Sequence, residues 1–324
     1  MIESLGMLAY ELLLELLVAS LLVWVVVVVV IRCFSITDPA WRVRFSALPV
    51  LLPVFGVPLI HLLIRPLFPE PHSAPLEHFL NSIISMSPLI AAVFLSVAGL
   101  LLFFGVTYIF QSLAGAVCYR LDWRHQHHQQ SALWLRCNDM LQPVVSKLHM
   151  SPVRLVLTDR STCGSIAFGP LGSYIVLSRA LVLMLDDEEL EGLLAHELGH
   201  IKRKDTLFGV VVGASRRLLA FSPFAQTACR SFSHAQEEAT DDLAIRTSGR
   251  PLALASCLVK ACRLTQGHYD REPSTCLLSS TSSAEHRIRR LFENYTCVAE
   301  PSGKYRWLFF GLVAVVFTIL LLVV

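Results

Sequence analysis

The chain has 324 residues, of which 54% are apolar and only 16% are charged. Soluble proteins carry about 25% charged residues, so this composition indicates a membrane protein. The net charge of +2 argues against a nucleic-acid-binding protein, which would concentrate basic residues on one face. The nine cysteines include no C-x-x-C pair, which indicates free thiols in a reducing compartment.

Four apolar segments are long enough to cross a lipid bilayer as helices. They cover residues 7–31, 45–64, 87–114 and 306–324. Glu11 and Glu15 interrupt the first segment, and we expect both to be hydrated near the outer interface. The alternatives for this pair are a helix contact or a lateral substrate gate. The first segment lacks a basic N-terminal region and a cleavage site, so we interpret it as an anchor.

Basic residues flank these segments unevenly. They follow the first segment and the third, and they precede the fourth, at Arg32, Arg42, Arg44, Arg120, Arg124, Lys304 and Arg306. The N-terminus has no basic residue. The loop after the second segment contains Arg65 together with two glutamates, Glu70 and Glu77. The positive-inside rule therefore predicts an outer N-terminus and places residues 119–305 in the cytosol.

The predicted cytosolic part contains two strands, 153–158 and 174–178, and we expect the second to present an open edge to substrate. The histidine-rich stretch 125–128 is interpreted as an interfacial linker, with a second metal site as the alternative. Residues 206–221 are apolar, but two arginines interrupt them. We therefore predict a buried or membrane-grazing helix there rather than a fifth span.

An H-E-x-x-H motif lies in the middle of this part. His196 and His200 are four residues apart, so on a helix both imidazoles project from one face and can bind one metal ion. Glu197 lies beside them and can act as a general base. Asp186 and Glu189 are spaced as a capping box for this helix. Apolar residues recur at helical spacing: Leu190, Leu194, Leu198 and Ile201.

A catalytic zinc site needs a third protein ligand, and the predicted helix 233–247 offers two candidates. Glu237 is followed one turn later by Asp241, and Glu238 is followed by Asp242. In either pair, the first carboxylate could bind the metal and the second could orient a ligand histidine. The spacing of the carboxylates does not decide between the two pairs. The alternative to a metal site is that these residues form a solvated acidic face of the helix.

The run H-E-L-G-H-I-K-R-K-D, followed by E-E-A-T-D-D-L-A, resembles the membrane gluzincin peptidases. It is particularly similar to the peptidases of the BlaR and MecR antirepressors, with HtpX and the CAAX proteases as more distant relatives. Three apolar segments before the motif and one after it match the BlaR and MecR arrangement. The resemblance implies three transmembrane helices in residues 1–118 and an α+β zincin-like metallopeptidase domain in residues 119–305.

The resemblance also implies roles for individual residues. The ligands of one zinc ion would be His196, His200 and Glu237, and Glu197 would be the catalytic base. In these peptidases the carboxylate that orients a ligand histidine is typically followed, three residues later, by a small residue.

This family pattern favours Asp241 over Asp242. Three residues after Asp241 comes Ala244, whereas three residues after Asp242 comes the larger Ile245. The prediction is therefore Glu237 as ligand, with Glu238 as a solvated neighbour or helix-terminus partner.

Two departures from the family pattern are visible. HtpX-like enzymes carry a His-Pro-Pro triplet ahead of a characteristic arginine. In this chain the triplet is replaced by Thr281-Ser282-Ser283, and only the arginine, Arg287, matches. The resemblance implies that Arg287 organises the active site. The BlaR and MecR proteins also continue into an extracellular penicillin-binding sensor. No Ser-x-x-Lys is found in the predicted outer segments, so we expect no acylation by a β-lactam.

Together these features predict a zinc endopeptidase of the bacterial cytoplasmic membrane that cleaves a protein or peptide substrate at the cytosolic face. The resemblance implies regulatory signalling through a cytosolic transcriptional repressor, with HtpX-like quality control as the alternative. A non-catalytic scaffold would have no need of Glu197. A transporter would need more intramembrane polar pairs than the two glutamates offer.

Overall fold

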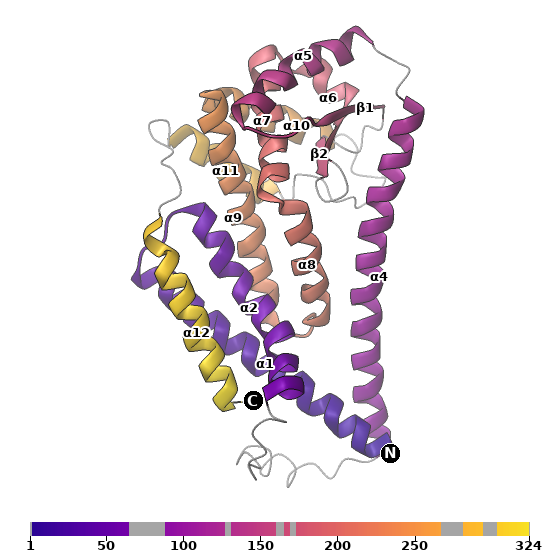
Figure 1. Cartoon of the computed structure of the whole chain (residues 1–324), viewed down its shortest axis with the longest axis vertical. Helices are drawn as coiled ribbons and strands as arrows, with labels where there is room; N and C mark the ends of the chain where they lie inside the picture. Colours follow the sequence, from indigo (N-terminus) through magenta and orange to yellow (C-terminus); the bar gives the residue numbers. More distant parts are fainter. Residues whose placement is uncertain are drawn as a thin grey trace. The chain divides into compact units, whose positions relative to one another are not determined.

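The computed structural model describes residues 2–64, 88–126, 131–159, 165–168, 173–266, 281–293 and 303–323. The described chain is mostly helical (Figure 1). It divides into two compact units. The first comprises Met1–Gln111, Val211–Ser233 and Ser302–Val324, and the second comprises Ser112–Val210 and His234–Pro301.

The first unit contains α1 (Ile2–Cys33), α2 (Pro39–Leu59) with the π-helix η1 (Ile60–Ile64), the first part of α4 (Pro88–Gln126), and α12 (Arg306–Val323) after the short η3 (Gly303–Tyr305). Four stretches are long and apolar enough to cross a membrane: Leu5–Cys33, Pro39–Ile64, Ile90–Ser112 and Gly303–Leu322. The second begins earlier than the predicted residue 45, because Asp38 caps the helix and Pro39 suits its first turn.

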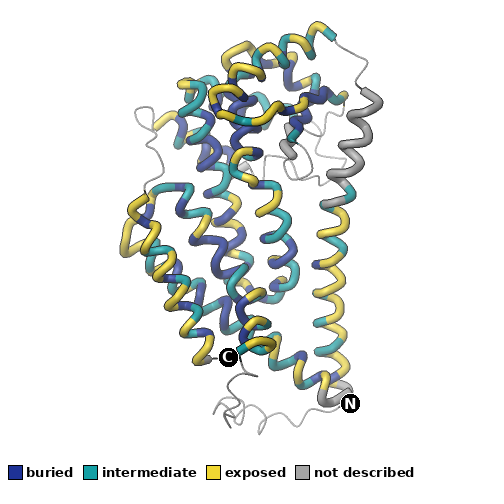
Figure 2. The backbone as a smooth tube through the Cα atoms, viewed as in Figure 1, coloured by how far each residue is buried: buried dark blue, intermediate teal, exposed yellow. Residues whose placement is uncertain are grey.

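The core of the first unit joins α1, α2 and α12 through buried aromatic and aliphatic side chains, including Phe45 and Leu320. Many residues along these helices and along the described part of α4 are exposed (Figure 2). Glu15 differs from the expectation of simple hydration, because its Oε2 lies 2.7 Å from Nε2 of His61. The helix contact, given above as an alternative, is therefore what forms.

The second unit contains α5 (Ala132–Lys147), β1 (Arg154–Thr158), β2 (Ser165–Phe168), β3 (Tyr174–Ser178), α6 (Arg179–Met184), α7 (Asp187–Arg203), α10 (Pro251–Gln266) and α11 (Thr281–Glu293). Two more helices, α8 (Asp205–Leu218) and α9 (Pro223–Ser248), belong in part to each unit.

The sheet corrects one prediction. Its strand order is β1-β3-β2, with β3 parallel to β1 and antiparallel to β2. Strand 174–178 is therefore the central strand and not an open edge, because both of its sides are already hydrogen-bonded. All five of its residues are buried. Among the described strands, β1 and β2 form the edges.

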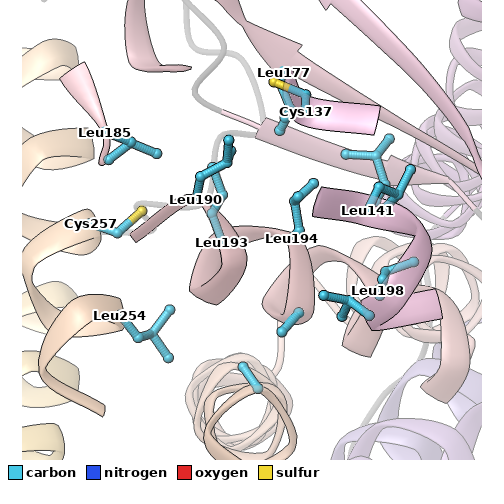
Figure 3. Close-up of a cluster of buried hydrophobic side chains, with 14 of the residues drawn as sticks. Cys137, Leu141, Leu177, Leu185, Leu190, Leu193, Leu194, Leu198, Leu254 and Cys257 are labelled. Atoms are coloured by element: carbon cyan, nitrogen blue, oxygen red, sulfur yellow. The ribbon is translucent and has the colours of Figure 1, made fainter. Parts of the chain in front are cut away.

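The core of the second unit packs α7 between α5, the sheet and α10 (Figure 3). The predicted stripe of α7 is buried throughout, with Leu190, Leu194 and Leu198 fully inaccessible. Burying each such side chain contributes about 1.5–3 kcal/mol, so this face fixes the rotation of α7 and turns the opposite face toward α9. The histidine-rich stretch lies partly outside the described residues, so its interpretation stays a prediction.

Candidate metal centre

The local sequence determines where α7 begins and ends. Asp186 accepts a hydrogen bond from the backbone N–H of Glu189, whose side chain accepts one from the N–H of Asp186, so the predicted capping box is confirmed. The helix ends at Lys204, which adopts a left-handed conformation with φ of 59°. This turn starts α8 at Asp205, directly beside the last histidine of the motif.

The helices α7 and α9 approach closely because Gly199 has no side chain. A Cβ atom at this position would lie 2.8 Å from Cγ2 of Thr240 on α9. The absence of that atom lets the acidic face of α9 reach the histidine face of α7. Ala244, the small residue favoured by the family frame, is also fully buried in the same core.

Three donor groups converge between these helices. Nε2 of His196 lies 3.2 Å from Nε2 of His200. The carboxylate of Glu237 lies 3.6 Å from the first of these nitrogens and 3.8 Å from the second. One donor atom from each of the three residues falls within a 4.8 Å group, a spacing that could hold a metal ion.

The outer nitrogens of both histidines face carboxylates. Nδ1 of His196 lies 3.0 Å from Oδ1 of Asp241, and Nδ1 of His200 lies 2.9 Å from Oδ2 of Asp205. We assign the imidazole proton to Nδ1 in each ring, which directs both Nε2 lone pairs toward Glu237. When neither Nε2 carries a proton, two lone pairs and a carboxylate face one point and repel one another unless a cation lies between them. The donor set therefore fits a metal ion.

Asp205 is the residue that sequence reasoning missed. Besides His200, its carboxylate accepts hydrogen bonds from Nε of Arg203 at 3.1 Å and from Oγ1 of Thr240 at 3.2 Å. Burial raises the pKa of Asp205, but the hydrogen bond from His200 and the charge of Arg203 outweigh burial and lower it. The sequence offered one indication of this role, because Asp205 is the last residue of the run H-E-L-G-H-I-K-R-K-D that resembles the family.

Arg287 of α11 joins two of the acidic groups. Its Nη1 lies 2.9 Å from Oε2 of Glu237. Its Nε and Nη2 donate to the two oxygens of Asp241 at 2.8 and 2.7 Å. This bidentate geometry suits a guanidinium and a carboxylate. The position predicted from the family arginine therefore lies in the cluster, although the triplet before it is absent.

The charges in the cluster shift one another's pKa values. Burial alone raises the pKa of Glu237, but Arg287 and the two histidines lower it to about 2. Burial alone lowers the pKa of His196, but Asp241 and Glu237 raise it to about 9. A metal ion binding at Nε2 therefore competes with a proton.

Glu197 is only 1% exposed, yet its Oε1 accepts no hydrogen bond from any residue that the structure describes. A buried carboxylate oxygen without a protein donor is costly in a purely structural role. It suits a group whose partner is a reactant.

Glu238 is only 5% exposed, so the first alternative given for it, a solvated neighbour, is wrong. Its Oε1 lies 3.6 Å from Nδ1 of His286, and its backbone carbonyl accepts from Arg290 at 3.3 Å. Arg290 also donates to Asp242 at 2.6 Å. The alternative pair Glu238 and Asp242 is thus turned toward α11, away from the two histidines.

Comparison with known proteins shows the family of the chain. Residues 8–291 match the family described as "BlaR1 peptidase M56". The chain belongs to this family. Curated relatives are named "Protease HtpX homolog". The protein of Pyrococcus abyssi is 30% identical over 125 residues, which cover 28% of this chain and 43% of the relative.

The relative from Acidiphilium cryptum is 27% identical over 172 residues, covering 42% of this chain and 60% of that protein. The relative from Methylibium petroleiphilum is 25% identical over 194 residues, covering 49% and 69%. The chain matches less than two thirds of the first two relatives. Family membership and the four apolar helices together support a membrane protease.

Proposed function

We propose that this chain is a membrane-bound zinc endopeptidase. The observation that carries the proposal is the convergence of His196, His200 and Glu237 within 4.8 Å, next to a buried Glu197 whose Oε1 has no described donor. The peptidase part would be a zincin-like α+β domain within residues 119–305, on the cytosolic side of a bacterial cytoplasmic membrane.

The two imidazoles and the carboxylate would hold the zinc ion, with Asp241 and Asp205 orienting the rings. A bound zinc ion supplies Lewis acidity to the scissile carbonyl and lowers the pKa of the attacking water. Arg287 holds Glu237 and Asp241 in their positions. The ligand set thus keeps its geometry without help from the substrate.

Glu197 would act as the general base and then as the acid. Its carboxylate takes a proton from the attacking water while the water oxygen forms a bond to the carbonyl carbon. The same proton then passes to the leaving nitrogen as the C–N bond breaks. The products are one carboxylic acid and one amine, and Glu197 is regenerated.

The substrate would bind as an extended segment along β2 (Ser165–Phe168). This strand pairs with β3 on one side, forms an edge among the described strands, and packs against α7. Strand addition gives main-chain hydrogen bonds that do not depend on the substrate's side chains. This edge replaces strand 174–178, which the sequence had suggested.

The biological substrate would be a cytosolic protein cleaved in a signalling response, such as a transcriptional repressor. The match to the BlaR1 peptidase family over residues 8–291 supports this choice. Quality control of membrane proteins is the other outcome, because the curated relatives are HtpX homologues. Proteomic comparison of cells with and without the gene separates one stabilised regulator from many stabilised membrane proteins.

The activity is tested with the full chain in nanodiscs and an unfolded protein substrate. We expect cleavage that chelator abolishes and zinc restores. Glu197→Gln should keep about one zinc per chain and lose at least 100-fold in rate, since general base catalysis contributes about 10²–10⁴. Full activity in Glu197→Gln would remove this residue from the mechanism.

A further inference from the structure

The turn that joins α8 to α9 lies among the candidate spans. Val212, Leu219, Ala225, Ala228, Cys229 and Phe232 form one buried cluster with Ala47 and Val50 of α2. The ring of Phe224 lies 5.6 Å from that of Trp24 on α1. All of these residues belong to the first unit. Figure 1 shows the two helices side by side as a hairpin.

The contacts of this hairpin are with the middle parts of the spans. Oγ of Ser222, in the turn, lies 2.6 Å from Oγ of Ser20, and both side chains are fully buried. Ser20 stands next to the midpoint of the 29-residue stretch Leu5–Cys33. Leu218 approaches Gly105 of α4, where a Cβ would lie 3.3 Å from it. The turn therefore lies at the depth of the span centres.

Polar backbone groups at the turn have partners within the protein, which suits a hydrocarbon environment. Nε2 of Gln226 donates to the carbonyls of Arg216 and Leu219 at 3.1 Å each. These carbonyls lie at the C-terminal end of α8, where intrahelical N–H donors are lacking. Oγ of Ser222 accepts from the N–H of Ala225 at 3.3 Å. The turn thus closes the free ends of both helices with its own side chains.

Two arginines near the turn also have internal partners. The guanidinium of Arg217 lies 3.4 Å from the ring centre of Tyr108, and its Nη1 donates to the carbonyl of Gly213 at 3.0 Å. Nε of Arg216 donates to Oε1 of Gln226 at 2.8 Å. Side chains on a helix point toward its N-terminus, so on α8 they lean away from the turn. Snorkelling of this kind reduces the cost of placing arginine in a membrane.

We infer that residues 211–233 form a re-entrant hairpin that enters the bilayer and turns at its centre, with its exposed face against lipid acyl chains. Each leg has about ten residues, or about 15 Å at 1.5 Å per residue, which is half of a hydrocarbon core of about 30 Å. The inference rests on the membrane helices and not on the peptidase activity. The two legs belong to helices, α8 and α9, that continue in sequence into the second unit.

The depth is tested by photo-crosslinking the full chain in nanodiscs. p-Benzoylphenylalanine is placed at Ala220 in the turn and at Thr227 on α9, which are both exposed in the structure. Leu102, 60% exposed within the third candidate span, is the lipid-facing control, and the exposed Glu188 is the aqueous control. We expect acyl-chain adducts at 220 and 227 as at 102. Their absence while 102 reacts overturns the inference.

The anchoring contact is tested with the double variant Ser20→Cys/Ser222→Cys. Because the two hydroxyl oxygens are 2.6 Å apart, mild oxidation should form an intramolecular disulfide that mass spectrometry detects and either single variant lacks. Failure to form it contradicts the placement of the turn against α1. A disulfide without acyl adducts contradicts the lipid contact. Neither readout needs peptidase activity, so an inactive protein would refute only the proposed function.

Discussion

The metal centre and the hairpin 211–233 each contain buried polar groups, but the groups are of different kinds. In the metal centre the buried groups are charged, and Arg287, Asp241 and Glu237 compensate one another within hydrogen-bond distance. In the hairpin the buried pair is two neutral hydroxyls, Ser20 and Ser222. Buried charges cost several kcal/mol each unless they are paired. The charged groups of the metal centre therefore depend on one another, whereas the two hydroxyls at the hairpin need only a single hydrogen bond.

The largest effect is expected from substitution of Glu237, the proposed third ligand, because it is one of the charged groups of the metal centre. Glu237→Ala should remove the metal and the activity together, because two imidazoles alone do not complete the donor set. Glu238→Gln should keep about one zinc per chain, since that side chain faces His286. Metal analysis of the two purified variants decides the question. Zinc retained in the first variant and lost in the second would reverse the assignment.

A smaller effect is expected from the residue that orients His200. Asp205→Asn should weaken zinc affinity by about 10–100-fold, as is typical for a partner of a ligand histidine. The matched control is Asp187→Asn on α7, whose side chain is 73% exposed and pairs with Arg136. Competition with a fluorescent chelator measures both affinities. Equal zinc affinities of Asp205→Asn and Asp187→Asn would show that Asp205 does not orient His200 and serves only as the first residue of α8.

The arginine of α11 tests whether its geometry or its charge matters. Arg287→Lys keeps the charge but loses the bidentate bond to Asp241, so we expect a loss of about 1.5–3 kcal/mol of stability. Arg289→Lys on the same helix is the control, because Arg289 is 66% exposed and pairs with Glu285 across one turn. Thermal unfolding of the zinc-loaded proteins measures both. A similar melting temperature for the two variants would assign Arg287 a purely electrostatic role.

Much of this centre could be predicted from the sequence because its chemistry restricts residue types at fixed spacing. The two histidines, the capping box and the apolar stripe of α7 all follow from helical periodicity, and the structure places them as expected. Four apolar stretches likewise had to be helices if they cross a bilayer, because their backbone must bond internally.

The rest depended on contacts between distant residues. The pairing of β3 with two neighbours could not be inferred, because an edge strand and a central strand of five residues look alike in sequence. Glu238 was expected to be a solvated neighbour or a helix-terminus partner, because nothing in the sequence pairs it with His286 of α11. The hairpin was recognisable only as an apolar run with two arginines. Its contacts with Ser20 and Tyr108, which indicate its depth, form only after folding.

The smallest expected effect concerns a buried charge that lies outside both regions. Glu189 accepts from Nζ of Lys260 at 2.6 Å and from Oγ of Ser256 at 2.5 Å. Burial raises its pKa, but these bonds and the capping bond to Asp186 lower it below its ordinary value. The unfolded chain, with a pKa of about 4.3, therefore binds the proton more readily than the folded one.

The ionised form of Glu189 thus stabilises the fold above about pH 4.3, and this contribution is lost as the pH falls through the lower pKa of the folded state. Glu189→Gln preserves the capping bond and removes the charge, so we expect about 1–2 kcal/mol less stability at pH 7. The gap to wild type should narrow as the pH falls toward 4 and below. Thermal unfolding across this range measures it, with the exposed Glu188→Gln as control. Parallel curves for Glu189→Gln and wild type would show that the Lys260 contact contributes no net charge stabilisation.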